Sequence, residues 1–158
     1  GPKSGTGRLL VIDGEPQRIT TKPEIGTYFD YFIIQAYKPG SDSNLDKRLI
    51  DGKVWGPGLV ETFGGVMSEE LITKRTIMTE NFEATDAAMD GGYPYTDRYG
   101  NSMKSLEGMA RWQPKNGFRK GGVGSYHMEA EYPTNPEYKN LRKAIQIMNP
   151  STKPLIKY

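Results

Sequence analysis

Short apolar runs, rich in β-branched and aromatic residues and bounded by turn residues, indicate three buried strands. They span residues 8–13 (RLLVID), 28–37 (YFDYFIIQAY) and 75–82 (RTIMTENF). None of these runs alternates strictly between apolar and polar positions. This lack of alternation is typical of strands covered on both faces of a parallel sheet. The second run nevertheless ends in the polar pair Gln35 and Tyr37, which needs an explanation.

A fourth strand is predicted over residues 105–114 (SLEGMARWQP), where a proline ends the segment. Gly108, Ala110 and Trp112 lie two residues apart and would therefore share one face of this strand. We expect residues 83–102 to form a long loop, 115–124 a glycine-rich loop, and 124–132 (GSYHMEAEY) an extended or loop-like segment.

Helical patterns separate these strands. Residues 45–66 predict a helix with Ser43 or Asn44 as its cap, which Gly52 and Gly56 break or end early. A short helical turn is expected after Ser68, a typical capping residue.

The last helix has the clearest signals, with Asn135 as cap and Pro136 in the first turn. Its apolar face comprises Tyr138, Leu141, Ile145 and Met148. The order is strand, strand, helix, strand, strand, helix, which predicts one α/β domain over residues 1–158 with a parallel sheet.

Composition narrows the function classes. The chain has 158 residues, a net charge of +2 with both signs interleaved, and no cysteine. The absence of a basic stripe argues against nucleic acid as a partner, and the absence of cysteine excludes disulfides and thiolate metal sites. No stretch approaches the roughly 20 apolar residues that a membrane-spanning helix needs.

The polar ends of the predicted strands suggest a ligand site. In a barrel of parallel strands the site lies at the carboxyl ends, where Gln35 and Tyr37 end one strand and Glu80 and Asn81 another. An aromatic floor made by Trp112 beside such hydrogen-bonding groups suits a sugar ring. Two alternatives stay open: Trp112 as a core residue, and Tyr37 with its hydroxyl in water.

A metal site is the weaker hypothesis. His127, Glu129 and Glu131 alternate along an extended stretch and could share one face, but the chain has a single histidine. We therefore predict no metal and no cofactor.

The segments FDYFIIQAY, RTIMTENFE, GMARWQP and GGVGSYHMEAEY together resemble the C-terminal half of a glycoside hydrolase family 18 barrel. The bacterial endo-β-N-acetylglucosaminidases are the most similar type. The resemblance runs from RLLVIDG to the last helix and implies strands five to eight of a (β/α)8 TIM barrel.

The resemblance also implies a mechanism. In this family the acetamide oxygen of the substrate attacks the anomeric carbon, so that the substrate replaces one of the usual two carboxylates. By position in the motifs, Tyr37 would bind the acetamide with Gln35 as its polar neighbour, and Trp112 would form the floor of the sugar subsite. Glu80 and Asn81 are assigned to substrate binding from their position alone.

The chain departs from the family at one essential point. The D-x-x-D-x-D-x-E run that carries the acid/base glutamate occurs nowhere in these residues. A general acid contributes about 10²–10⁴-fold to the rate, so we expect little or no hydrolysis by this polypeptide alone. Half a barrel would also leave strand edges open, which predicts a fragment of a larger enzyme or a chain that pairs with another.

Three functions follow as hypotheses. The first is the C-terminal half of an endo-acting hydrolase that cleaves the chitobiose core of N-glycans, and the second a non-catalytic protein that binds glycans containing N-acetylglucosamine. The third is an α/β domain of no fixed ligand. The resemblance alone implies secretion or a location at the bacterial cell surface or periplasm.

Overall fold

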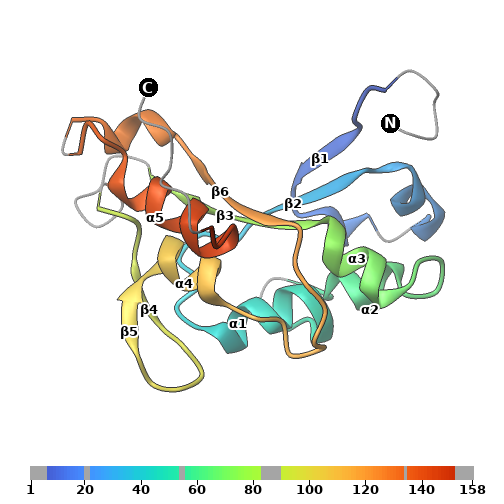
Figure 1. Cartoon of the computed structure of the whole chain (residues 1–158). Coiled ribbons are helices and arrows are strands. Elements are labelled where there is room, and N and C mark those ends of the chain that lie inside the picture. The colour runs from blue at the N-terminus through green and yellow to red at the C-terminus, as the bar shows by residue number, and fades with distance from the viewer. Residues whose placement is uncertain (1–6, 20–21, 54–55, 83–89, 134, 152–158) are drawn as a thin grey trace.

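The structure, a computed structural model, describes residues 7–19, 22–53, 56–82, 90–133 and 135–151. Its centre is a four-stranded, fully parallel sheet in the order β1-β2-β3-β6 (Figure 1). The strands are β1 (Val11–Gly14), β2 (Tyr31–Gln35), β3 (Thr76–Asn81) and β6 (Gly122–Tyr126). The predicted α/β class with a parallel sheet is thus confirmed for the described residues.

Helices follow or separate the strands. They are α1 (Asp42–Asp46), α2 (Leu59–Phe63), α3 (Glu69–Arg75), α4 (Ser105–Arg111) and α5 (Lys139–Met148). Further turns of 3-10 or π-helix cover Pro16–Arg18, Pro23–Tyr28, Lys47–Asp51 and Met128–Glu131. No described helix has the length and apolar character required to cross a bilayer.

Strand alternation divides the sheet into two different faces. Phe32, Ile34 and Met78 have no exposed surface and pack beneath the helices, which Figure 1 shows on a single side of the sheet. Tyr31 and Ile33 point the other way and remain partly exposed. We call these the helix face and the open face of the sheet.

The helix face carries the main hydrophobic core. Each large side chain that it removes from water stabilises the fold by about 1.5–3 kcal/mol. The fully buried members besides the strand residues include Leu45, Leu49, Leu59, Phe63, Ile72 and Met109. A second, smaller cluster of Phe82, Leu106, Ala110 and Ala144 joins α5 to α4.

The prediction of a strand over residues 105–114 is wrong, because Ser105–Arg111 form α4. Leu106, Met109 and Ala110 are buried at helical spacing, which outweighs the alternation of small residues that suggested a strand. Glu107 and Arg111 form an i,i+4 ion pair of 2.9 Å on the outer side.

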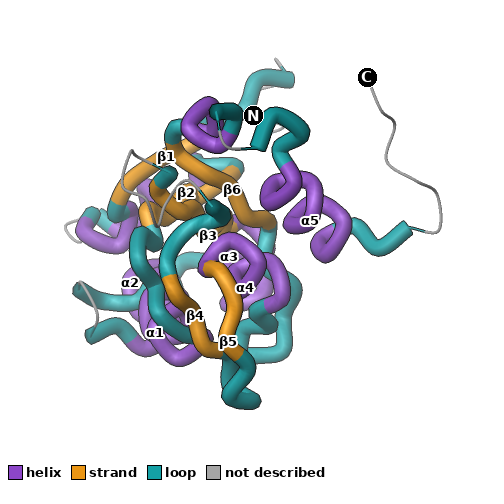
Figure 2. The backbone as a smooth tube through the Cα atoms, turned by 90° about the vertical axis from the view of Figure 1, so that its left-hand side faces the viewer, coloured by secondary structure: helices purple, strands orange, loops and turns teal. Residues whose placement is uncertain are grey.

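The fourth strand is instead β6, which covers the end of the predicted glycine-rich loop (115–124) and the start of the segment expected to be extended or loop-like (124–132). The predicted long loop of residues 83–102 also contains a strand, β4 (Pro94–Thr96), which pairs in antiparallel fashion with β5 (Ser102–Lys104). Figure 2 shows this hairpin beside α4, and residues 83–89 lie outside the described part of the chain.

Helix boundaries follow capping chemistry, with shifts from the sequence prediction. Ser41, rather than Ser43 or Asn44, caps α1 by accepting the backbone N–H of Asn44 at 3.4 Å. The break expected after residue 51 is present, at Gly52 with φ 73°.

Two further caps were predicted, and one is confirmed. Ser68 accepts the N–H of Leu71 at 3.2 Å and begins α3. Asn135 does not cap α5, because that helix begins only after Tyr138. The side-chain amide of Asn135 donates to Glu131 Oε1 instead. Of the predicted apolar face of α5, Ile145 is 47% exposed, and Ala144 is the buried residue.

An ion-pair network fastens α1 to the segments that follow it. Asp42 accepts the hydroxyl of Tyr95 at 2.5 Å and Nε of Arg98 at 3.1 Å. Asp46 accepts indole Nε1 of Trp112 at 3.1 Å, and Arg98 Nη2 lies 3.5 Å from it. Burial, together with the Asp42 hydrogen bond, raises the pKa of Tyr95 far above its usual range.

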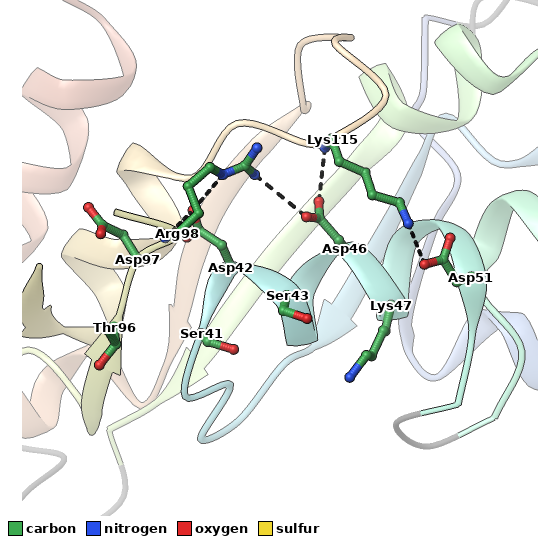
Figure 3. Close-up of a pocket in the computed structure, with 10 residues that line it drawn as sticks. All are labelled: Ser41, Asp42, Ser43, Asp46, Lys47, Asp51, Thr96, Asp97, Arg98 and Lys115. Atoms are coloured by element: carbon green, nitrogen blue, oxygen red, sulfur yellow. Dashed lines mark hydrogen bonds and ion pairs between the residues drawn. The ribbon is translucent and has the colours of Figure 1, made fainter. Parts of the chain in front are cut away.

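Figure 3 shows the Asp42, Asp46 and Arg98 part of this network, which lines a cavity of about 300 Å³. Lys115 donates its backbone N–H to Asp46 at 3.0 Å and pairs through its ammonium with Asp51. Arg98 pairs with both Asp42 and Asp46, and Lys115 with Asp51, so these charged groups at the cavity bind one another. The network therefore serves to hold the fold together.

Replacing Asp46 with alanine should destabilise the protein by about 2–3 kcal/mol, because it leaves the buried indole N–H of Trp112 and the partly buried backbone N–H of Lys115 without an acceptor. Asp51→Ala is the matched control: its pair with Lys115 is about half exposed and contributes less than about 1 kcal/mol. Urea unfolding of both variants measures the difference, and equal losses would contradict this role of Asp46.

Candidate functional site

The carboxyl ends of β2, β3 and β6 bring together polar and aromatic side chains on the open face. Register pairs Gln35 with Thr79, and Asn81 with Tyr126. Gln35, Tyr37 and Asn81 are all partly exposed there, and Tyr126 is 45% exposed. Tyr37 lies two residues beyond the end of β2, and its ring, 6.4 Å from that of Tyr126, is at the same edge as Gln35.

The aromatic rings at this edge form a row. The ring centroids of Tyr37 and Tyr126 lie 6.4 Å apart, and that of His127 lies 4.0 Å from Tyr126 in an edge-to-face arrangement. Two parallel strands that flank a third are about 9.5 Å apart, so the tyrosine rings lean towards each other across the end of β3. This row offers ring faces and phenol groups to a ligand above Asn81.

Asn81 and Glu80 were both assigned to substrate binding, but consecutive strand residues point to opposite faces. Asn81 belongs to the open face, opposite Tyr126. Glu80 has no exposed surface and lies on the helix face. In this structure it therefore cannot make the predicted contact with a substrate.

Glu80 instead binds backbone groups of the edge. Its Oε1 accepts the N–H of Asn81 at 2.8 Å and of Lys38 at 3.2 Å. Burial raises the pKa of the Glu80 carboxyl, against the lowering effects of the Ser105 hydroxyl, these two N–H groups and the charge of Arg48. The carboxyl is therefore an internal anchor, enclosed by protein.

Trp112 is also placed differently from the prediction. It follows the last residue of α4, is 1% exposed, and packs in the main core with its indole bound to Asp46. A ring enclosed in this way presents no face to a sugar, so Trp112 does not form the predicted sugar floor beside Tyr37. The alternative of a core tryptophan is the one the structure realises.

Arg48 supports Gln35 from the helix face. Its Nη1 donates to the Gln35 carbonyl oxygen at 3.4 Å and lies 3.6 Å from Glu15 Oε1. The Arg48 side chain is 4% exposed, and burial lowers the pKa of its guanidinium despite the nearby carboxylates. Nothing in the sequence pattern identified this residue, because its partners come from separate segments.

The carboxylates once considered for a metal face different neighbours. His127 Nδ1 lies 2.9 Å from Glu129 Oε1, and this contact lowers the pKa of Glu129 after the larger effect of its own backbone N–H. Glu131 is fully buried and accepts the N–H of Asn140 near the start of α5 at 2.8 Å. Within the described residues no group of three His, Cys, Asp or Glu could hold a metal ion.

Sequence reasoning missed Tyr126 as a site residue. Its segment, GSYHMEAEY, was read as extended or loop-like, while the fourth strand was placed over residues 105–114. Had residues 122–126 been taken as that strand, its end would have placed Tyr126 level with Asn81.

Comparisons with known proteins bear on this site. The sequence model of the family described as glycoside hydrolase family 18, BT1044-like, matches residues 1–147. Endo-beta-N-acetylglucosaminidase F2 of Elizabethkingia meningoseptica is 27% identical over 166 residues, which cover 95% of this chain and 42% of that protein.

Two solved structures have similar folds. A selenomethionine-labelled glutamate-to-glutamine variant of BT1044 shares 32% identity at a TM-score of 0.68, over 92% of this chain and 40% of that one. An endo-beta-N-acetylglucosaminidase from Cordyceps militaris, in apo form, shares 24% identity at a TM-score of 0.58, over 95% and 47%. The chain thus spans less than half the length of these relatives.

A parallel sheet with helices on one face fits these barrel-shaped relatives, and the fold is α/β of the TIM-barrel-like type. With a family match that extends over residues 1–147, the chain belongs to glycoside hydrolase family 18 and resembles its endo-β-N-acetylglucosaminidases.

Proposed function

We propose that this chain supplies the sugar-binding half, strands five to eight, of a family 18 barrel that cleaves glycans containing N-acetylglucosamine. The observation that carries the proposal is the set of side chains at the carboxyl end of the open face, namely Gln35, Tyr37, Asn81 and Tyr126. The carboxyl end is where barrel enzymes place their sites. The endo-β-N-acetylglucosaminidases among the relatives support this substrate class.

The chemistry assigned to these residues is substrate-assisted and retaining. The substrate's acetamide oxygen attacks the anomeric carbon and forms an oxazolinium, which water then opens. The Tyr37 phenol hydrogen-bonds the acetamide as charge develops on it, and Gln35 beside it orients the same group. The Tyr126 ring, in place of Trp112, stacks on the C–H face of the sugar.

The proton donor comes from elsewhere in this proposal. Glu80 and Glu131 are fully buried away from the open face. Glu15 lies 3.3 Å from Arg18, and Glu129 binds His127. With the D-x-x-D-x-D-x-E run absent from the sequence, the general acid belongs to residues that complete the barrel.

A second candidate is a non-catalytic protein that binds the same glycans. The lack of an acid motif in these 158 residues favours it. Glycan binding without release of new reducing ends, measured on the complete protein, would support this candidate over the hydrolase.

Exposed apolar side chains at the β1 edge indicate where the rest of the barrel binds. Leu9, Leu10 and Val11, at the free edge beside β1, are 62%, 48% and 40% exposed. Apolar groups at an open strand edge favour pairing with further strands. We propose that the first half of the barrel, in the same polypeptide or in a second chain, covers them; secretion or a bacterial surface location remains a proposal from the family.

Tyr37→Phe in the complete barrel should lower kcat for glycan release from an N-glycosylated peptide by about 10²-fold, because a hydrogen bond to the reacting acetamide is lost. Tyr126→Ala should mainly raise KM, since it removes a stacking surface. Release of reducing ends measures both. Unchanged kcat in Tyr37→Phe would contradict the assigned role, and Tyr28→Phe, 69% exposed and outside the site, is the control.

The 158-residue chain alone should form complexes, either with itself or with an added first half of the barrel, because its edge is open. Analytical ultracentrifugation measures this association. Leu10→Lys should weaken it, since the edge side chain then carries a charge. A stable monomer near 17.7 kDa that does not bind the added first half of the barrel would contradict the proposed partner.

A further inference from the structure

The turn that carries Tyr37 has an unusual backbone. The N–H of Ala36 donates to the carbonyl oxygen of Ile34 at 2.8 Å. Lys38 has φ 51°, in the left-handed region that residues other than glycine seldom adopt. Such a conformation persists only when its surroundings hold it in place. Whatever holds Lys38 therefore also sets the direction in which Tyr37 leaves β2.

Glu80 provides that hold from the neighbouring strand. Its Oε1 accepts the Lys38 N–H at 3.2 Å while it also accepts the N–H of Asn81 at 2.8 Å. One buried oxygen thus joins the residue after Tyr37 to the residue that ends β3. Both bound residues border the proposed sugar site.

The Glu80 side chain is itself fixed. It has no exposed surface, and the Ser105 hydroxyl lies close to its carboxyl group. The backbone of Gly92, with φ 98°, lies against it so closely that an added Cβ would come within 2.9 Å of Glu80 Cγ. Tyr93 N–H binds the same Ser105 hydroxyl at 2.8 Å, so the segment around residue 92 encloses the carboxyl.

A parallel arrangement supports Gln35. Arg48, buried on the same helix face, donates to the Gln35 carbonyl, and its charge interacts with that of Glu80. The two site residues at the end of β2 and in the turn after it are thus both held from behind, Gln35 by Arg48 and Tyr37 through Lys38 by Glu80.

We propose that Glu80 is a positioning residue for Tyr37, which it directs towards Tyr126 and the sugar acetamide without touching substrate. The inference rests on the proposed function for its catalytic consequence, while the placement of the Tyr37 ring is a property of the protein alone. Glu80 thereby fixes the orientation of the Tyr37 phenol, which stabilises the reacting acetamide.

Two substitutions separate reach from charge. Glu80→Asp keeps the charge but shortens the side chain by one methylene, which withdraws the oxygen from Lys38 N–H. Glu80→Gln keeps the length and an acceptor oxygen but removes the charge. Thermal unfolding of both variants in the complete protein establishes that they are folded.

The first readout is the position of the Tyr37 ring. The nuclear Overhauser effect between the rings of Tyr37 and Tyr126, 6.4 Å apart between centroids, should be retained in Glu80→Gln and lost in Glu80→Asp. Lys38→Gly keeps the N–H group and removes the Lys38 ammonium from its place 4.5 Å over the Tyr93 ring, so it should retain the effect. Retention in Glu80→Asp, or loss in Lys38→Gly alone, would overturn the proposal.

The second readout is affinity for a thiazoline derived from N-acetylglucosamine, a stable analogue of the oxazolinium. Loss of one hydrogen bond predicts about three- to tenfold weaker binding in Glu80→Asp and recovery in Glu80→Gln. In a Tyr37→Phe background the effect of Glu80→Asp should disappear, because the two residues act through one group. An equal effect in both backgrounds would overturn the proposal. A wild-type protein that binds no thiazoline would instead count against the proposed function, and the ring readout would still test the positioning.

Discussion

The burial of one face of a parallel sheet is the constraint on which the rest of this structure depends. Phe32, Ile34 and Met78 pack under the helices, so the sheet is covered on that side. Because side chains alternate along a strand, every second residue must then face the other way. The polar residues at the strand ends are thereby sorted into anchors on the helix face and candidate ligand contacts on the open face.

This sorting explains why neighbouring residues have different roles. Glu80 and Asn81 are adjacent, yet one binds backbone groups inside the protein and the other faces the open side. At the carboxyl end of β2, Gln35 and Tyr37 lie at the same edge, while Arg48 holds the backbone of Gln35 and Glu80 that of Lys38 from behind. The candidate site is therefore a thin layer of side chains supported by a buried layer of charged hydrogen-bonding groups.

A second buried network lies further along the helix face. Asp42 and Asp46 bind Tyr95, Arg98 and Trp112, so these polar groups are engaged with one another. Trp112 shows how composition can mislead: an aromatic residue next to small residues suits a sugar floor and a core position equally well. Only its burial beside Asp46 decides between them.

The sequence by itself determined that strands lie at residues 11–14, 31–35 and 76–81 and that the sheet is parallel, because these features depend on apolar runs and on spacing within one segment. It did not determine whether residues 105–111 form a helix or a strand, since glycine and alanine fit both, and the choice rests on the packing of Leu106 and Met109. The positions of Trp112, Tyr126 and Glu80 depend on contacts between segments distant in the chain. Those were decided only by the tertiary structure, because no local pattern records which strand lies beside which.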